Sequence, residues 1–317
     1  MILILTKSYD PTADFVCEKA KMRGIGVHRV DLDSLPKEGT VSIMGNGSWA
    51  IDANTGKIDS REIKRVWQRR IPTIKMGFPD PEANEYAEKE WRLLFEWWIN
   101  SLPDGRVLDP EHRLKFAYNK LLQLQCAKRV GLTVPDTLVT TDRVLVEQFY
   151  EKHGGMIVVK SLGGFGKVHT DRQEFEAIYT SQVTEKDLAR LSELKCVPVV
   201  FQTCIEKLYE IRATVVGDQI FSCKIESQKS EKTKIDWRKY DFKNVPHTQI
   251  ELPPAINEKI LSVMSTFGIH FASFDLAFDQ SGQYIFFEMN PNSQWVWIEN
   301  LTGMPITEAL LDYLNCD

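Results

Sequence analysis

Two short apolar runs near the C-terminus, residues 271–278 and 283–289, are interrupted by three polar residues, Asp275, Glu288 and Asn290. The runs are joined by Asp-Gln-Ser-Gly, whose residues favour tight turns, so the segment predicts a β-hairpin. A carboxylate within an apolar strand is costly unless a cation or another partner meets it. If the strands pair, Asp275 and Glu288 lie near each other, and with the Asn290 amide they form an oxygen-only site suited to Mg2+. The alternative is a polar sheet end that faces water.

The composition limits the class of protein. The chain has 317 residues, of which 43% are hydrophobic and 26% charged, with a net charge of -5. This balance is typical of a soluble globular protein with two or three lobes, and it argues against nucleic-acid binding. No apolar run is long enough for a membrane span and no signal peptide is evident, so we expect a cytoplasmic location. The six cysteines are scattered without a CxxC pair, which predicts reduced thiols.

Residues 1–108 predict an N-terminal α/β domain. The expected elements are a strand (2–5), a helix (10–23), a strand (26–31), a hairpin (41–44 and 48–51), a strand (65–69) and a helix (82–102). The first three have the spacing of a parallel βαβ unit. No GxGxxG motif indicates a dinucleotide site. The apolar face of the last helix is expected to contain Tyr86, Leu93, Leu94, Trp97 and Trp98.

The remaining chain predicts two further subdomains, 109–195 and 196–317. Apolar residues at three- and four-residue spacing favour one continuous helix over 113–130, which carries Lys120. The later elements are a strand (157–160), a short helix with a capping box at Thr184, a strand (197–202), a hairpin (210–216 and 219–225), a helix (254–267) and a last helix (305–315).

A lysine at a strand end begins a glycine-rich segment. Lys160 closes the run 157–160 and is followed by Gly163, Gly164 and Gly166. A lysine placed there can meet a phosphate, and glycines let backbone N–H groups approach phosphate oxygens. The segment is not a P-loop, and an exposed loop is the alternative. The next strand passes at Gln202 into a hinge whose backbone suits an adenine edge.

Two acid–base pairs follow. Glu210 and Arg212 lie on the same face of a predicted strand, and Asp236 and Arg238 lie in a loop rich in both charges. For that loop, an ordinary solvated connection is the alternative.

The order of these features resembles the ATP-grasp superfamily over about residues 110–310. The resemblance implies an α/β (α+β) ATP-grasp fold, in which a pre-ATP-grasp lobe precedes central and C-terminal lobes that clasp ATP. The roles that it implies are phosphate contacts from Lys120 and Lys160, adenine contacts from Gln202, Thr203 and Ile205, a ribose contact from Glu210, a phosphate or acyl-phosphate contact from Arg212, and Mg2+ ligation by Asp275, Glu288 and Asn290.

Four further segments resemble a subfamily, the ATP-grasp maturases of ribosomal peptides (graspetide or microviridin-type macrocyclases). They are VWQRRIP (66–72), NKL (119–121), NPNSQW (290–295) and LTGMPI (301–306). With them the resemblance covers nearly the whole chain. It departs at Gln68, where Tyr is common, and at Ser293, where Gly is common, which puts the placement of the substrate in doubt.

This subfamily implies an ATP- and Mg2+-dependent peptide macrocyclase. An Asp or Glu side chain of a precursor peptide would be phosphorylated and then attacked by a Thr or Ser hydroxyl, giving an ester, or by a Lys amine, giving an amide. Arg212 would clamp the acyl phosphate, and Arg238 would bind acidic core side chains. Asp236 would orient Arg238 or deprotonate the nucleophile. A leader peptide would dock near the Thr184 helix and the hairpin 210–225, and a homodimer is expected, with the helix 82–102 as a candidate surface.

Two other functions stay open at this point. An ATP-grasp amino-acid ligase of the glutamate-ligase or glutathione-synthetase type would share the Asp-Trp-Arg segment at 236–238. A non-enzymatic nucleotide-binding module is the third reading, although a complete set of phosphate and metal groups argues against it. No residue distinguishes an ester from an amide product.

Overall fold

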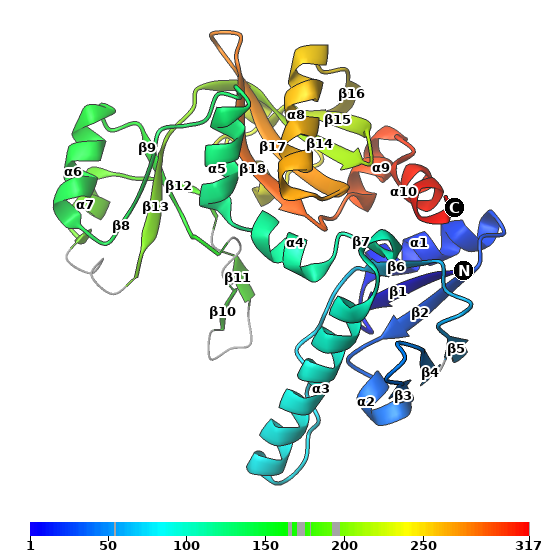
Figure 1. The fold of residues 1–317 in the computed structure, drawn as a ribbon. Coiled ribbons are helices and arrows are strands. Elements are labelled where there is room, and N and C mark those ends of the chain that lie inside the picture. The colour runs from blue at the N-terminus through cyan, green and yellow to red at the C-terminus, as the bar shows by residue number, and fades with distance from the viewer. Residues whose placement is uncertain (54, 164–166, 170–174, 178, 192–196, 317) are drawn as a thin grey trace.

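The computed structural model describes residues 1–53, 55–163, 167–169, 175–177, 179–191 and 197–316. Gly164 and Gly166, two of the predicted phosphate-loop glycines, lie outside the described residues. Figure 1 shows three lobes, one built around β1, one around β9 and β13, and one around β14 and β17. No helix in the described ranges has the length and apolar character that crossing a bilayer requires.

The N-terminal lobe contains a parallel sheet with the strand order β2-β1-β6-β7. Its elements are β1 (Ile2–Thr6), α1 (Pro11–Met22), β2 (Val27–Asp31), β6 (Arg65–Gln68) and β7 (Val107–Leu108). All five residues of β1 are buried, and the first four, Ile2 to Leu5, are apolar, as is typical of a parallel strand covered on both faces of its sheet. The predicted βαβ unit is therefore present. A short helix, α2 (Leu35–Glu38), leads to a second, antiparallel sheet of β3 (Thr40–Ile43), β4 (Trp49–Ala53) and β5 (Gly56–Asp59).

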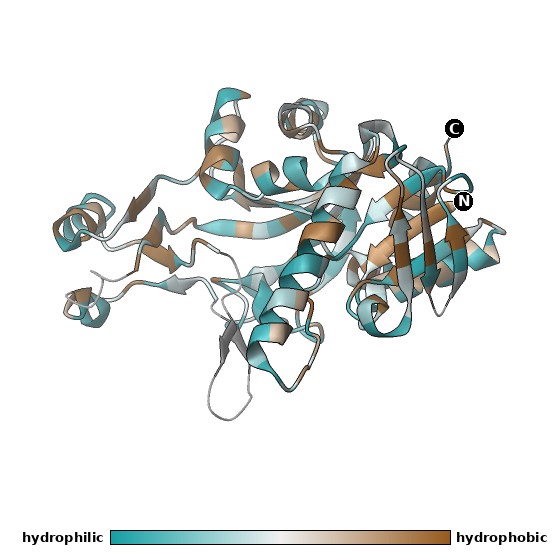
Figure 2. Ribbon diagram, turned by 60° about the horizontal axis from the view of Figure 1, so that its bottom comes forward, coloured by the Kyte–Doolittle hydropathy of each residue, from teal (hydrophilic) through white to brown (hydrophobic). Residues whose placement is uncertain are grey.

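Helix α3 (Pro81–Ser101) is present, but its predicted apolar face is only partly correct, because Trp98 is buried as expected and Tyr86 and Trp97 are not. The buried residues are Phe95, Trp98 and Ile99, whereas Trp97 is 69% exposed and Tyr86 is 67% exposed. Figure 1 shows α3 projecting from its lobe, and in Figure 2 its N-terminal part is largely hydrophilic. The core covers only one face of the C-terminal half of α3. Tyr86 and Trp97 lie outside that face and stay in contact with water.

The single helix expected over 113–130 is wrong, because two helices occupy this segment. They are α4 (Glu111–Ala117) and α5 (Lys120–Arg129), and Asn119 separates them. The Asn119 side chain accepts a hydrogen bond from the backbone N–H of Leu122 at 3.1 Å and caps α5. Asn favours caps over helix interiors because its side chain competes for backbone hydrogen bonds. Lys120 is consequently the first residue of a helix rather than a residue within one.

The central lobe contains an antiparallel sheet with the strand order β12-β9-β13-β8. Its elements are β8 (Thr137–Thr140), α6 (Arg143–Lys152), β9 (Ile157–Lys160), β12 (Ser181–Gln182), α7 (Glu185–Leu188) and β13 (Val199–Thr203), with β10 (Lys167–His169) and β11 (Phe175–Ala177) paired separately. The capping box predicted at Thr184 is present at the start of α7. A small core that includes Phe149, Ile157 and Phe201 joins the helices to the sheet.

The C-terminal lobe is a five-stranded antiparallel sheet with the strand order β16-β15-β14-β17-β18. Its elements are β14 (Lys207–Val216), β15 (Gln219–Ile225), the turns η3 (Ser227–Lys229) and η4 (Trp237–Lys239), β16 (His247–Ile250), α8 (Pro254–Phe267), β17 (Phe271–Asp279), β18 (Tyr284–Pro291), α9 (Val296–Thr302) and α10 (Ile306–Asn315). Both predicted hairpins are present. Helix α10 lies beside α1, where Arg23 pairs with Glu308 and Asp312, so both ends of the chain share one core.

Cysteine side chains are free thiols throughout the described ranges. Cys126 and Cys223 are buried, Cys17 and Cys204 are partly buried, and Cys316 is exposed. The expectation of reduced thiols thus agrees with their placement in this part of the chain.

We predict that Asn119→Ala lowers the free energy of unfolding by about 1 kcal/mol, because the first turn of α5 loses its cap. Urea denaturation followed by circular dichroism measures the change. Asn119→Ser retains a capping oxygen and should remain within a few tenths of a kcal/mol of the parent. Equal destabilisation by Ala and Ser would show that the cap does not set the position of this helix start.

Candidate active site

The three predicted metal ligands come together in the middle of the β17–β18 hairpin, on the paired strands themselves. Asp275 and Glu288 are direct cross-strand neighbours, followed by a register shift between Asp275 and Leu276. The amide Nδ2 of Asn290 donates to Asp275 Oδ2 at 2.8 Å and to Glu288 Oε1 at 3.3 Å. The set is rich in oxygen, as Mg2+ requires, although Asn290 must turn its amide over to present Oδ1 to a metal. No group of three His, Cys, Asp or Glu occurs elsewhere in the described ranges as a competing metal site.

Asp275 and Glu288 each pair with a cationic side chain from another element. On β14, Arg212 Nη1 donates to both carboxylate oxygens of Asp275 at 2.8 Å. On α5, Lys120 Nζ donates to Glu288 Oε2, and Arg238 Nη1 lies 3.8 Å from Glu288 Oε1. Burial alone would raise the pKa of Glu288, but Lys120 and Arg238 outweigh it and hold that pKa below its usual range. Burial raises the pKa of Asp275 against the opposing effect of Arg212.

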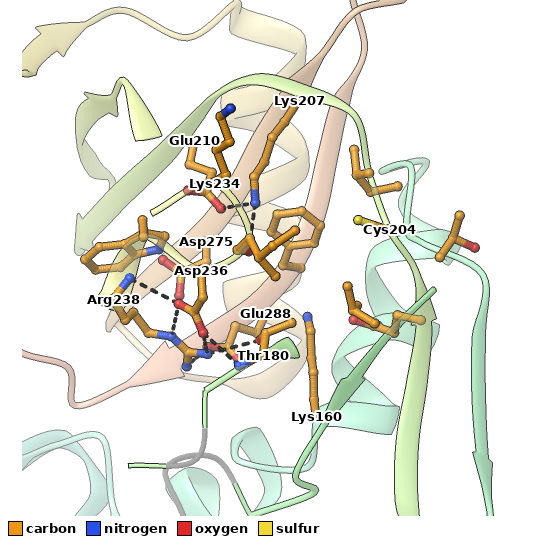
Figure 3. A pocket seen from close by; sticks show the side chains of 17 residues that line it. Lys160, Thr180, Cys204, Lys207, Glu210, Lys234, Asp236, Arg238, Asp275 and Glu288 are labelled. Atoms are coloured by element: carbon orange, nitrogen blue, oxygen red, sulfur yellow. Dashed lines mark hydrogen bonds and ion pairs between the residues drawn. The ribbon is translucent and has the colours of Figure 1, made fainter. Parts of the chain in front are cut away.

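Lys160 lies at the end of β9 and points into the cleft between the central and C-terminal lobes, as predicted (Figure 3). Its Nζ lies 5.1 Å from the centre of the Phe287 ring. Burial lowers the pKa of Lys160 to about 8, and the nearby cations Arg238 and Lys120 contribute to this fall. A phosphate group beside Lys160 would therefore favour the charged ammonium form of its side chain.

The other end of the cleft holds a buried ion pair that sequence reasoning found only in part. Glu210 Oε1 accepts a hydrogen bond from Lys207 Nζ at 2.6 Å, and Lys207 also donates to the carbonyl oxygen of Ile235 at 3.0 Å. Burial raises the pKa of Glu210 in spite of Lys207. Lys207 was not predicted, because side chains three residues apart on a regular strand point to opposite faces, and the pairing of β14 with β17 is irregular between Lys207 and Tyr209.

The hinge residues line the same cleft. Gln202, Thr203 and Ile205 lie on its wall with Lys160 and Lys207. Gln202 Nε2 donates to Thr137 Oγ1 at 3.0 Å. Three buried oxygens that line this cleft have no hydrogen-bond partner among the described residues: Gln202 Oε1, Thr203 Oγ1 and Glu210 Oε2. Buried polar atoms without partners are rare in folded proteins, so these oxygens point to a polar ligand.

The segment 236–238 is not the solvated connection considered above. Asp236 is buried and accepts from Arg238 Nε at 2.8 Å, from Arg238 Nη2 at 2.6 Å and from the backbone N–H of Thr180 at 3.0 Å. Burial would raise the pKa of Asp236, but the paired guanidinium lowers it, and Asp236 in turn raises the pKa of Arg238. Thr180, which sequence reasoning missed, ties this pair to the central lobe.

Two spaces meet at these residues. The cleft holds about 70 Å³ of free volume, which is small beside the roughly 300 Å³ or more of typical ligand pockets, so it has to widen to admit a nucleotide. An outer cavity of about 480 Å³ is also lined by Asp275 and Glu288, which it shares with the cleft. Its lining includes Lys120, Gly163, Arg212, Arg238, Asn290 and, from the N-terminal lobe, Arg70. Gly163 is thus placed at the outer cavity.

A buried arginine joins this site to the N-terminal lobe. Arg69 follows β6 and is fully buried; its Nη1 donates to Asn292 O at 2.7 Å and to Asn292 Oδ1 at 3.1 Å. Asn292 Nδ2 donates back to the carbonyl oxygens of Gln68 at 3.1 Å and Arg69 at 2.6 Å. Asn292 has a φ of 54°, a conformation that Asn tolerates better than most residues. This reciprocal contact holds the chain two residues beyond Asn290.

Comparison with known proteins identifies the family. Residues 1–115 match the family model of the MvdD pre-ATP grasp domain. The macrocyclase MdnC of Microcystis aeruginosa MRC, solved with its precursor peptide MdnA, is 32% identical over 99% of this chain and 98% of its own, with a TM-score of 0.86. The chain belongs to the ATP-grasp macrocyclase family that includes MdnC. The predicted ATP-grasp fold and the predicted macrocyclase resemblance are therefore confirmed.

Two further proteins are similar to this chain. A RiPP-associated ATP-grasp ligase of Chryseobacterium gregarium, solved with ADP and with a leader and core peptide, is 29% identical over 99% of this chain and 96% of its own, with a TM-score of 0.90. The glutamate–LysW ligase ArgX of Sulfolobus acidocaldarius is 25% identical over 227 residues, which is 71% of this chain and 78% of ArgX. The chain is thus an ATP-dependent ligase, as predicted.

We predict that ATP binding above pH 8 takes up a proton at Lys160. The pKa of this amine in the free enzyme is about 8, and a phosphate neighbour favours the ammonium form and raises that pKa. Affinity for ATP is accordingly full below pH 8 and falls as the pH rises above it. Calorimetric titrations at about pH 9, in two buffers with different ionisation enthalpies, measure the uptake.

Lys160→Arg should abolish the uptake, because a guanidinium stays protonated at that pH. Lys128→Arg, a change at an exposed lysine of α5, should leave it intact. Identical heats for the parent enzyme in both buffers would contradict the lowered pKa of Lys160.

Proposed function

We propose that this macrocyclase closes rings in a ribosomally made precursor peptide by using ATP to activate Asp or Glu side chains of that peptide. The observation that carries the proposal is the outer cavity, which brings Arg70, Arg212 and Arg238 together with the predicted metal ligands. A cationic cavity of this size suits an acidic side chain that approaches bound nucleotide. The 32% identity with a macrocyclase solved with its precursor peptide supports the same substrate class.

In this proposal the cleft binds Mg-ATP. The hinge oxygens of Gln202 and Thr203 face the adenine, Glu210 faces the ribose, and Lys120 and Lys160 face the phosphates. Asp275, Glu288 and Asn290 hold Mg2+, which when bound neutralises charge on the phosphoryl oxygens. The ADP found in the Chryseobacterium gregarium ligase supports a nucleotide in this family. Gly163 and the glycines 164 and 166 complete the predicted phosphate contacts.

The chemistry follows from the low reactivity of a carboxylate. Transfer of the γ-phosphoryl group from ATP to a peptide carboxylate gives an acyl phosphate and ADP. A hydroxyl or amine of the same peptide then attacks the acyl carbon, the carbon–oxygen bond to phosphate breaks, and the proton of the nucleophile leaves to solvent or to a base. Arg212 can bind the acyl phosphate, because its planar fork suits oxyanions. One ring closes for each ATP consumed.

Arg238 and Asp236 take distinct roles. Both oxygens of Asp236 accept from Arg238, which favours orientation of Arg238 over proton removal by Asp236. Arg238 then faces the acidic side chain in the outer cavity.

We also propose that residues 1–108, 109–195 and 196–317 act as three domains and that the enzyme is a homodimer. The exposed Tyr86 and Trp97 on α3 support that helix as its contact surface.

The second candidate is an amino-acid ligase, which the 25% identity with glutamate–LysW ligase ArgX favours. It would use the same acyl phosphate but add a free amino acid to it. The two functions differ in the mass of the product. Ring closure removes one water per crosslink, whereas ligation adds the mass of an amino acid less water.

We predict that a precursor with a leader and an acidic core, incubated with enzyme, ATP and Mg2+, loses one water per ring in mass spectrometry. A suitable precursor is a short peptide, encoded beside the enzyme, that contains Asp or Glu together with Thr, Ser or Lys. Deleting the leader should collapse turnover, and adding it as a separate peptide should restore part of it. A mass gain that depends on a free amino acid would instead establish the ligase.

We predict that Glu288→Gln and Asn290→Ala each lower the rate of ring closure and of ATP turnover by about 100-fold or more, because charge on the transferring phosphoryl loses its compensation. Circular dichroism should show an intact fold. Glu226→Gln, which changes a surface carboxylate paired with Lys224 and Lys229, is the matched control and should keep the parent rate. Parent-like turnover in both site variants would refute the metal assignment.

A further inference from the structure

Five aromatic rings form one surface beside the outer cavity, which we name the aromatic platform. Its members come from η4, the residues after it, β16 and α9: Trp237, Tyr240, Phe242, His247 and Trp297. Tyr240 and Phe242 stack at 5.1 Å, Trp237 and Trp297 lie 5.2 Å apart, and His247 meets Trp297 edge-on at 5.7 Å. Ring pairs at these distances stabilise one another, so the platform is a preformed surface.

The platform is open to solvent on its outer side. Tyr240 is 42% exposed and Phe242 is 50% exposed, whereas Trp237 beneath them is buried. Single exposed aromatic residues are common on protein surfaces, but a contiguous group rimmed by charges is typical of a binding surface. Trp237, Tyr240 and Trp297 also line the outer cavity, so the platform continues the space in which the acidic side chain is expected.

The backbone at Tyr240 is held in an unfavourable conformation. Tyr240 has a φ of 42°, which is unusual for a bulky residue, and a glycine would adopt it more readily. The conformation is fixed by a bond from Lys232 Nζ to the Tyr240 carbonyl oxygen at 2.8 Å and by a bond from Tyr240 N–H to the Trp237 carbonyl oxygen at 3.1 Å. Strain of this kind is found where a side chain has to be presented at a site.

Cationic and aromatic surfaces meet at Trp237. The guanidinium carbon of Arg212 lies 5.8 Å from the Trp237 ring, and Arg238 follows Trp237 directly in the chain. A peptide that places a carboxylate at the arginines therefore has its neighbouring side chain above apolar rings. That neighbour would gain apolar burial on the platform, and an aromatic ring would also gain ring–ring contact.

We propose that the aromatic platform binds an apolar side chain of the precursor, best an aromatic one, that adjoins the acidic residue to be activated. The proposal rests on the proposed function, because the carboxylate in the outer cavity sets the register of the peptide. The platform then selects which acidic residue of the core reacts.

The test uses blocked tetrapeptides with the parent enzyme, a non-hydrolysable ATP analogue and Mg2+. The probes are acetyl-Gly-Glu-Phe-Gly-amide, its Glu-Ser analogue and its Gln-Phe analogue, and ligand-observed NMR titration gives their dissociation constants. The Glu-Phe peptide should bind about fivefold more tightly than the Glu-Ser peptide, and saturation should transfer to its Phe ring. Equal affinity for these two peptides would overturn the inference.

Variants separate the platform from general effects. Tyr240→Ser should reduce the Phe preference to within about twofold, Tyr240→Phe should keep it, and Trp297→Leu should reduce it from another element. Phe78→Ala removes a comparably exposed aromatic side chain that does not line this cavity, and it should keep the preference. A preference that survives in both Tyr240→Ser and Trp297→Leu would place the Phe ring elsewhere and overturn the inference.

The Gln-Phe peptide separates this inference from the proposed function. If Glu and Gln peptides bind equally while the Phe preference holds, the platform stands and the acidic cavity of the proposed function fails. If Glu is preferred over Gln but Phe and Ser bind equally, the proposed function stands and the platform inference fails.

Discussion

The structure depends on cations that compensate two neighbouring carboxylates in a sheet, one buried and one partly buried. Asp275 and Glu288 would be costly in this position alone, since desolvation penalises each charge and the two repel one another. Their compensation comes from distant segments, with Arg212 on the adjacent strand, Lys120 at the start of α5 and Arg238 after the buried Asp236. Helix α5, strand β14 and the turn η4 must therefore all be in place before the two carboxylates are stable in this position. Folding of these three elements thus also brings the residues of the site together.

The N-terminal lobe takes part in this assembly through Arg69. Burial lowers the pKa of this arginine to about 10, so it remains charged at neutral pH, and its guanidinium carbon lies 5.8 Å from the Trp67 ring and 5.9 Å from the Trp295 ring. Its bonds to Asn292 fix the chain just beyond β18, and Asp10 lies 3.6 Å away as a counter-charge. Loss of this contact would free the segment that carries Asn290 without touching any ligand. The N-terminal lobe consequently helps to hold the candidate site in place, and through Arg70 it also lines the outer cavity.

Local patterns predicted the strands and most helices because their signals lie within a few residues. The β17–β18 hairpin, with its acids at Asp275 and Glu288, follows from two apolar runs joined by a turn sequence, and the predicted ligands meet as expected. The break at Asn119 was missed because apolar spacing continues across it, and only the side-chain cap decides it. Lys207 was missed because its position in the cleft depends on a hydrogen bond to the carbonyl oxygen of Ile235, which is distant in sequence. The exposed Tyr86 shows the same limit, since periodicity does not say how far a core extends along a helix.

The charges around the cleft indicate why nucleotide and metal should bind together. Four cationic side chains, Lys120, Lys160, Arg212 and Arg238, surround the carboxylates Asp236, Asp275 and Glu288. Mg2+ alone would enter a site with an excess of positive charge, and ATP alone would bring its phosphates beside the carboxylates of Asp275 and Glu288. Mg-ATP, with a smaller net charge, avoids both penalties. For Lys120 to reach a phosphate it must leave Glu288, and Glu288 is then free to ligate the metal. Under the proposed assignment each event would favour the other, and the affinities for metal and nucleotide would be coupled in both directions.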